Sequence, residues 1–445
     1  MIQTWRKTSS ELIYSPNVIK DIHMKTIDGY DVKIFTDNIE DTAIEQIRQL
    51  LSIDVFSDCK IRIMPDVHAG AGCVIGFTGN LGDKVIPNIV GVDIGCGMLV
   101  QPFICNNPID FHALNEYILR AIPSGRDFRD ENYLPLSQKY SDIYQNAKQL
   151  ILQLRCYREL KEVRRLYKSI GSLGSGNHFI ELDKDESDLY YLVVHTGSRN
   201  LGKQVADIYQ KLAVKCQSGW DKLMVEKNRI IEEYKQAGRK SELQDVIRNL
   251  HNSFKTCKLT IPQDLCYLQG QFREDYLHDM HICQCWAQIN RKLIVNLIMD
   301  FIVGKGVVSS EEHFRPFESV HNYIGNDNII RKGAISARLG EKCIIPLNMR
   351  DGSLICIGKG NEDWNFSAPH GAGRIMSRSQ AFKEISLEDF KKSMEDVYSE
   401  TVTEYTKDES PMVYKSKREI MNNIKGTVDI ETVIKPVFNF KAADI

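Results

Sequence analysis

The stretch Val90-Gly91-Val92-Asp93-Ile94-Gly95-Cys96-Gly97-Met98 places a carboxylate and a thiol three residues apart, among three glycines. The apolar run 86–92 leads into it, and this run predicts a buried strand that ends at a turn. Glycine lets the backbone bend around a metal centre where a Cβ would clash. Asp93 and Cys96 can therefore bind one divalent metal. The alternative interpretation is a buried structural cysteine beside a capping aspartate.

Four histidines stand in glycine-rich segments or at the ends of predicted strands. His178 follows the small-residue loop 171–177, His195 ends the β-rich run 189–194, and His321 precedes Asn322. His370 follows Pro369 and precedes Gly371-Ala372-Gly373, an arrangement that can expose an imidazole and offer N–H groups to a phosphate. Imidazole, carboxylate and thiolate together suit zinc, iron or manganese, and ligand softness alone does not choose among them.

Two further pairs leave a structural and a functional interpretation open. Asp66 and His68 point the same way if their segment is extended, but a turn aspartate beside a half-buried histidine explains them equally well. His278 and His281 fall three apart on a predicted helix, where core or surface positions are the better explanation than a metal site.

The composition is that of a soluble globular protein. Of 445 residues, 42% are hydrophobic and 26% charged, and the net charge of −2 gives no overall basic character. Any contact with nucleic acid must therefore depend on a local basic surface. The twelve cysteines and the absence of an apolar leader in Met1 to Lys7 predict free thiols in the cytoplasm. The polar residues within 287–303 favour a core helix over a membrane span.

Hydrophobic periodicity predicts a mixture of strands and helices. Strands are expected at 30–35, 61–64, 328–337, 342–347 and 433–440, and helices at 41–51 and within 110–168 and 203–302. The 203–302 segment has two apolar stripes around Gly238, which predict a peripheral helical hairpin, followed by a longer helix over 276–303. No internal repeat or low-complexity linker interrupts the chain.

Together these motifs resemble the RtcB family of RNA-splicing ligases. The resemblance is carried, in order, by Asp93-x-x-Cys96, Gly174-Ser175-Gly176-Asn177-His178-Phe179-x-Glu181, His195-Thr196-Gly197-Ser198-Arg199, His321-Asn322 and His370-Gly371-Ala372-Gly373-Arg374. It extends from about Pro65 to Lys441. It implies an α+β fold: one large domain over 1–445, with mixed β-sheets around a metal cleft and helices outside.

The resemblance also implies a GTP- and Mn²⁺-dependent RNA ligase with two Mn²⁺ per chain. By analogy Asp93, Cys96 and His178 hold one ion, and Cys96, His195 and His321 hold the other. His370 attacks the α-phosphate of GTP to form a covalent histidine–GMP. The guanylate then passes to an RNA 3′-phosphate, derived where needed from a 2′,3′-cyclic phosphate, and a 5′-hydroxyl end displaces GMP. Neutral imidazole is nucleophilic near pH 7, which agrees with this role.

Further positions match the nucleotide contacts of the family. These are Asn177, Glu181, Asn322, Gly371, Ala372, Gly373 and Lys441, with Arg199 and Arg374 as phosphate or RNA contacts. The segment 346–352 departs from the usual Pro-Gly-Ser-Met turn, which removes a serine contact that Asn348 can replace.

Three classes of function are consistent with these motifs. The first is a ligase acting on broken RNA ends in tRNA splicing or RNA repair, with RNA and GTP as partners, no membrane, and an accessory activating protein as a further partner to expect. The second is a metal-dependent RNA phosphodiesterase or nucleotidyl hydrolase that opens cyclic phosphates without ligation. The third is a non-catalytic RNA- or nucleotide-binding protein, against which the complete ligand set argues.

Overall fold

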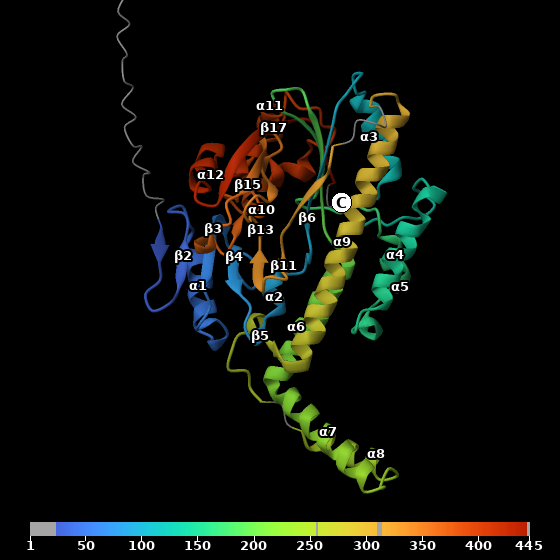
Figure 1. The fold of residues 1–445 in the computed structure, drawn as a ribbon, viewed down its shortest axis with the longest axis vertical. Coiled ribbons are helices and arrows are strands. Elements are labelled where there is room, and N and C mark those ends of the chain that lie inside the picture. The colour runs from blue at the N-terminus through green and yellow to red at the C-terminus, as the bar shows by residue number, and fades with distance from the viewer. Residues whose placement is uncertain (1–23, 255–256, 309–313, 443–445) are drawn as a thin grey trace, which may run out of the picture.

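Two large β-sheets form the centre of the computed structural model, which describes residues 24–254, 257–308 and 314–442 (Figure 1). The first sheet has the strand order β1-β2-β3-β4-β12-β11. Only β2 and β3 run parallel, so this sheet is mixed. Its strands are β1 (Lys25–Thr26), β2 (Val32–Ile34), β3 (Ile61–His68), β4 (Ile75–Asn80), β12 (Ile329–Lys332) and β11 (Tyr323–Ile324).

The second sheet is antiparallel throughout, in the order β10-β6-β8-β7-β17-β15-β14. Its strands are β10 (Phe317–Val320), β6 (Gly97–Phe103), β8 (Tyr190–Thr196), β7 (Phe179–Lys184), β17 (Val428–Lys441), β15 (Gly352–Gly358) and β14 (Lys342–Asn348). Two strand pairs complete the described structure: β13 (Ala334–Ser336) with β16 (Ser367–Pro369), and β5 (Lys84–Val85) with β9 (Leu268–Gln269). The predicted α+β class is confirmed.

Helices cover the outside of these sheets. The 35-residue helix α9 (Gly270–Gly304) is the longest, and it packs against β6, β8 and the helices α3 (Phe111–Ala121), α4 (Ser141–Leu152) and α6 (Arg199–Lys215) (Figure 1). Its centre is buried, as predicted for a core helix, and no helix among the described residues has both the length and the apolar character to span a bilayer. The remaining α-helices are α1 (Asp41–Leu51), α2 (Pro87–Val90), α5 (Val163–Lys168), α7 (Asp221–Gln236), α8 (Leu243–Ser253), α10 (Arg378–Glu384), α11 (Leu387–Ser393) and α12 (Lys417–Asn423).

Short helical turns connect these elements. A π-helical turn, Cys216–Trp220, joins α6 to α7, and 3₁₀ turns lie at Asp54–Phe56, Gln138–Tyr140, Tyr157–Glu159, Gln263–Leu265, Glu362–Trp364, Glu404–Glu409 and Pro411–Val413. The predicted helical hairpin is α7–α8, and Figure 1 shows it extending away from the body of the molecule. No residue of α8 is buried, which agrees with a peripheral position.

Two local predictions were wrong. The run 86–92 is not a strand: it forms the short helix α2, because Pro87 suits the first helical position and Gly91, at φ +88°, ends the helix. The predicted strand 328–337 is two strands, since Gly333 at φ +59° turns the chain from β12 in the first sheet to β13, which pairs with β16. The opening residues Met1 to Lys7 and the two ends of the predicted 1–445 domain lie outside the described residues, and the single-domain assignment stays a prediction.

Candidate metal and nucleotide site

Strand pairing brings the predicted metal ligands together where four strands of the second sheet begin or end. Met98 of β6 and Phe179 of β7 both pair with His195 of β8, and Val320 of β10 pairs with Gly97. The ligands therefore come from adjoining strand ends: Asp93 and Cys96 just before β6, His178 just before β7, His195 within β8, and His321 just after β10. All five meet although they are separated by as many as 228 residues (93 to 321).

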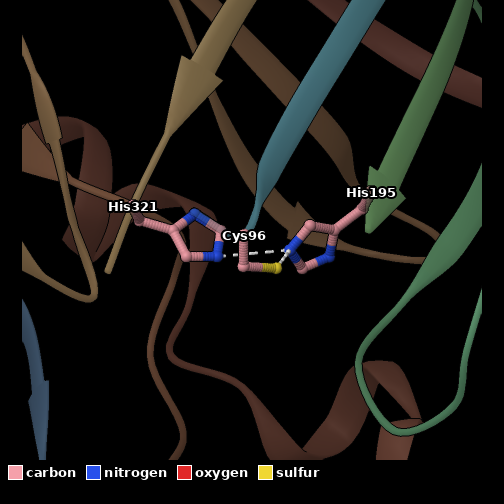
Figure 2. Close-up of side chains that lie close together, drawn as sticks. All are labelled: Cys96, His195 and His321. Carbon is pink, nitrogen blue, oxygen red and sulfur yellow. Dashed lines mark hydrogen bonds between the residues drawn. The ribbon is translucent and has the colours of Figure 1, made fainter. Parts of the chain in front are cut away.

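The five side chains form two groups that share one sulfur. In the first, His178 Nε2 lies 3.0 Å from Asp93 Oδ2 and 3.4 Å from Cys96 Sγ. In the second, His195 Nε2 lies 3.2 Å from Cys96 Sγ and 3.3 Å from His321 Nε2. Figure 2 shows the Cys96 side chain between the rings of His195 and His321. Each group offers three donor atoms of the kinds that bind divalent metals.

The histidines are held in the form that a metal requires. The Nδ1 atoms of His178 and His195 hydrogen-bond to the carbonyl oxygens of Leu173 (2.9 Å) and Asn177 (3.0 Å). When Nδ1 donates to a carbonyl, Nε2 keeps its lone pair and points it at the metal. Burial and neighbouring imidazoles lower the pKa of His195 and of His321 well below the usual value, which keeps both rings neutral.

The electrostatics of Cys96 also favour a bound cation. Burial, followed by the charge of Asp93, raises the pKa of the Cys96 thiol well above its ordinary value. A thiolate in this position therefore needs a positive charge beside it, and a metal ion supplies one. The donor set, its burial and its fixed tautomers fit divalent cations better than they fit a purely structural cysteine.

Buried polar groups support the loop that carries these ligands. Arg291 of α9 donates through Nη1 to the carbonyl oxygens of Gly95 (2.7 Å) and Thr196 (2.8 Å) and pairs with Glu318. Gly197 leaves the space that Asp93 occupies, because a Cβ there would lie 2.1 Å from Asp93 Oδ1. The ligand geometry thus depends on close packing behind the site.

His370 lies beside the second metal group and is oriented by a carboxylate. Its ring centroid is 4.9 Å from that of His321, and its Nδ1 is 2.6 Å from Asp66 Oδ2. Asp66 is fully buried on β3, and its other carboxylate oxygen has no hydrogen-bond partner among the described residues. When the His370 Nδ1–H donates a hydrogen bond to Asp66 Oδ2, the ring carries its lone pair on Nε2, which is the arrangement that a nucleophilic imidazole needs. Of the two interpretations left open for Asp66, the geometry favours the functional one.

A cavity of about 200 Å³ opens from His370. Most of the predicted nucleotide contacts line it: Asn177, Glu181, Asn348, His370, Gly371, Ala372, Gly373, Arg374 and Lys441. The Glu181 carboxylate accepts a hydrogen bond from Asn439 Nδ2 (2.7 Å). Burial raises the pKa of Glu181 to about 7, although Asn439 and Lys441 act in the opposite direction.

Sequence reasoning missed the charged wall of this cavity. Glu409, which is 2% exposed, accepts from Lys441 Nζ (2.8 Å) and Tyr414 Oη (2.6 Å), and Arg378 Nη1 lies 3.1 Å away. Burial alone would raise the pKa of Glu409, but Lys441 and the two arginines Arg378 and Arg374 outweigh it and lower that pKa. Nothing in the local sequence marks Glu409, because it lies in a short polar 3₁₀ turn that resembles a solvated segment.

Two predicted nucleotide or phosphate contacts lie outside the cavity wall. Asn322, at φ +62°, bridges the carbonyl of Asp93 (3.4 Å) and the N–H of Gly333 (2.9 Å), so it supports the metal loop. Arg199 donates to Ser172 Oγ (3.2 Å) and to the Gly125 carbonyl (2.8 Å), behind the glycine loop that precedes His178. Their roles toward a nucleotide stay predictions.

The remaining candidates stand apart from the site or within its wall. Arg374 lines the cavity while donating to the Asp408 carbonyl (2.6 Å), and Asn348 Oδ1 accepts from the backbone N–H groups of Arg350 (3.0 Å) and Asp351 (2.8 Å). The helix histidines His278 and His281 belong to neither metal group, as the structural interpretation expected. All twelve cysteines are free thiols, as predicted.

Comparison with known proteins gives the same assignment for nearly the whole chain. Residues 46–442 match the family described as tRNA-splicing ligase RtcB. The RNA-splicing ligase RtcB of Escherichia coli K12 is 30% identical over 402 residues, covering 85% of this chain and 88% of that protein. The tRNA-splicing ligase RtcB of Methanococcus maripaludis is 24% identical over 459 residues, covering 86% and 87%. The RNA-splicing ligase RtcB homolog 1 of Entamoeba dispar is 24% identical over 439 residues, covering 85% and 78%. With its motifs, its fold and this match in agreement, the chain belongs to the RtcB family.

Proposed function

We propose that this protein is a GTP- and Mn²⁺-dependent RNA ligase that joins 2′,3′-cyclic phosphate or 3′-phosphate ends to 5′-hydroxyl ends, in tRNA splicing or RNA repair. One observation carries the proposal. His370 is oriented by the buried carboxylate of Asp66. It lies next to the two candidate metal groups that share Cys96, and it lines a cavity that could hold a nucleotide. The names of the related proteins, all RNA- or tRNA-splicing ligases, support the same class of substrate.

The first step is nucleophilic attack by His370. Its Nε2 lone pair forms a bond to the α-phosphorus of GTP, and the bond to the β-phosphate oxygen breaks to release pyrophosphate. Asp66 Oδ2 accepts the hydrogen bond from the His370 Nδ1–H, with 2.6 Å between the two heavy atoms, and stabilises the positive charge that the ring acquires. The product is a histidine–GMP phosphoramidate.

The cavity residues hold the nucleotide during this step. A carboxylate at Glu181 can accept hydrogen bonds from the N–H groups of a guanine edge, and Lys441 lies on the same wall of the cavity. Gly371, Ala372 and Gly373 bring main chain close to the phosphates without side-chain bulk. When bound, two Mn²⁺ ions would offset the phosphate charge that repels an attacking group, and Asp93, Cys96, His178, His195 and His321 would hold them.

The later steps transfer the guanylate and seal the RNA. An oxygen of the RNA 3′-phosphate attacks the phosphorus of histidine–GMP, which frees His370 and leaves an activated RNA end. The 5′-hydroxyl of the second strand then attacks the RNA 3′-phosphorus, forms the new phosphodiester bond and displaces GMP. A 2′,3′-cyclic end first has to be opened by water to a 3′-phosphate.

Two assays test the proposal. Incubation with Mn²⁺ and GTP labelled at the α-phosphate should attach one guanylate to the wild type and none to His370→Ala. His112→Ala, which changes an exposed histidine outside the site, is the matched control and should label normally. The labelled protein should then join an RNA ending in 2′,3′-cyclic phosphate to a 5′-hydroxyl RNA. Equal labelling of wild type and His370→Ala would refute the mechanism, and cyclic-phosphate opening that consumes no GTP would identify a phosphodiesterase instead.

A further inference from the structure

A groove continues from the nucleotide cavity across the surface of α12. Asn348 and Tyr414 line both the nucleotide cavity and a second hollow of about 420 Å³. Lys417 lines that hollow and also a third one, of about 570 Å³, between α12 and the first residues of β17, with Lys359 beside them. Because neighbouring hollows share lining residues, the three hollows adjoin one another, and we call this row of hollows the α12 groove. Ile420 of α12 belongs to the same apolar cluster as Leu354 and Cys356 of β15, and Figure 1 shows α12 close to β15.

The far part of the α12 groove has an apolar floor and a basic rim. Met421, Ile424, Val428 and Ile430 supply the apolar atoms, and Ile424 and Val428 also belong to the core beneath. The rim carries Lys359, Lys417, Arg418 and Lys425 against a single acidic lining residue, Asp429. The groove is therefore positive in a protein whose net charge is −2.

Three of these cations form no ion pair among the described residues, and one of the three, Lys425, donates through Nζ to Asn422 Oδ1 (3.1 Å). Lys359 is already paired with Asp429, at 2.9 Å. Among the described residues, no carboxylate lies within 4.0 Å of the side-chain nitrogens of Lys417, Arg418 or Lys425. Most other surface cations near the groove are paired, as Arg350 is with Asp351. Proteins hold single-stranded nucleic acid in positively charged grooves that follow the phosphate backbone, and here the cations supply that charge while the floor offers aliphatic rather than aromatic side chains to the bases.

We propose that the α12 groove binds a single-stranded segment of the RNA substrate and leads its end to His370. This proposal rests on the proposed function, because it names where the substrate of that same site lies. The continuity of the groove with the nucleotide cavity favours RNA, since the reacting RNA end has to enter the cavity that holds the guanylate. The positive rim complements the negative charge of the RNA backbone.

The test removes the three unpaired cations together. The variant Lys417→Glu/Arg418→Glu/Lys425→Glu is compared with Lys211→Glu/Lys215→Glu/Lys222→Glu, which makes the same change in net charge on exposed positions of α6 and α7. Binding of fluorescently labelled single-stranded RNA is followed by anisotropy between 50 and 200 mM salt, separately for a 3′-phosphate strand and a 5′-hydroxyl strand. A neutral triple variant with glutamine at the three groove positions separates lost attraction from new repulsion.

Three lost phosphate contacts should reduce the salt slope by about 2, at roughly 0.7 per contact for a single strand. Across a fourfold change in salt, this corresponds to about a 20-fold smaller loss of affinity than in the wild type. For at least one of the two RNA strands, both groove variants should show this smaller salt dependence of affinity. The control variant should keep the wild-type salt dependence. Groove variants that bind both strands with the slope of the control would overturn the proposal.

A second readout separates this proposal from the proposed function. Guanylylation needs GTP and no RNA, so the groove variants should label His370 at the wild-type rate while ligation slows. Wild-type protein that fails to label would refute the proposed function itself. Normal labelling together with unchanged RNA binding in the groove variants would refute the groove alone. Thermal unfolding of each variant checks that the fold is retained.

Discussion

Replacing Asp66 by asparagine tests how His370 is made reactive. Asp66 is fully buried, and its Oδ2 lies 2.6 Å from His370 Nδ1. An ionised carboxylate can only accept at this position, so it fixes the proton on Nδ1 and the lone pair on Nε2. An amide at position 66 can donate to Nδ1 instead, which moves the ring proton to Nε2 and removes the nucleophile.

The expected decrease in the guanylylation rate follows from the hydrogen bond that is lost. A hydrogen bond to a charged group contributes roughly 1.5–3 kcal/mol, and about 1.36 kcal/mol corresponds to a tenfold change in rate. If this bond acts on the charged ring that forms in the transition state, Asp66→Asn should slow guanylylation by about 10- to 150-fold. The shape of the side chain is almost unchanged, so the loss should be in rate rather than in packing.

The assay is single-turnover labelling with GTP and Mn²⁺ at saturating concentrations, with thermal unfolding measured beside it. The matched control is Asp279→Asn, which changes another fully buried carboxylate that binds Tyr209 and the N–H groups of Arg155 and Cys156 outside the site. That control should lower stability and leave the labelling rate unchanged. Labelling of Asp66→Asn at the rate of the control would refute the assignment of Asp66.

Three further perturbations test the surroundings of the site. Because burial raises the pKa of Glu181 to about 7, its carboxylate forms only as pH rises through 7, so GTP binding measured by calorimetry should tighten between pH 6 and 8. Glu181→Gln should bind with no such pH dependence, and a profile like that of the wild type would contradict the assignment. Gly197→Ala should weaken Mn²⁺ binding about 10- to 100-fold in a metal titration, because the new Cβ would lie 2.1 Å from Asp93 Oδ1. The control is Gly82→Ala, whose new Cβ meets nothing within 4 Å and should leave Mn²⁺ affinity unchanged. Equal Mn²⁺ affinities of the two variants would count against the packing argument. Arg291→Met leaves the Gly95 and Thr196 carbonyl oxygens without this donor and Glu318 without its ion-pair partner, so the free energy of unfolding measured with denaturant should fall by about 3–5 kcal/mol. A fall below about 1 kcal/mol would show that this arginine does not hold the metal loop.

The sequence was most informative where chemistry and local geometry coincide. A single histidine after a glycine loop or at a strand end is usually structural, but the recurrence of this setting allowed His178, His195, His321 and His370 to be selected from the sequence. Helix α1 was predicted at its observed bounds, because its apolar spacing and acidic first turn are both local signals. Residues with a purely local signature were therefore the ones that sequence reasoning found.

Contacts between distant segments could not be predicted in this way. Asp66 and His370 are 304 residues apart, and nothing in the local sequence of Asp66 separates a turn aspartate from one that orients a histidine. Glu409 has the same difficulty, since its burial is created by Lys441, Arg378 and Tyr414 rather than by its neighbours in sequence. One local signal can also outweigh another: the apolar run 86–92 resembles a strand, but Pro87 and Gly91 within it favour the short helix α2.

The place of β17 in the second sheet has a consequence for how the protein is made. This strand lies between β7 and β15, and it carries Asn439 and Lys441, yet it leaves the ribosome after both of these neighbours. Until it emerges, β7 lacks one of its two neighbours, and the wall of the candidate cavity lacks Asn439 and Lys441. The candidate nucleotide cavity can therefore be completed only after residue 441 has left the ribosome.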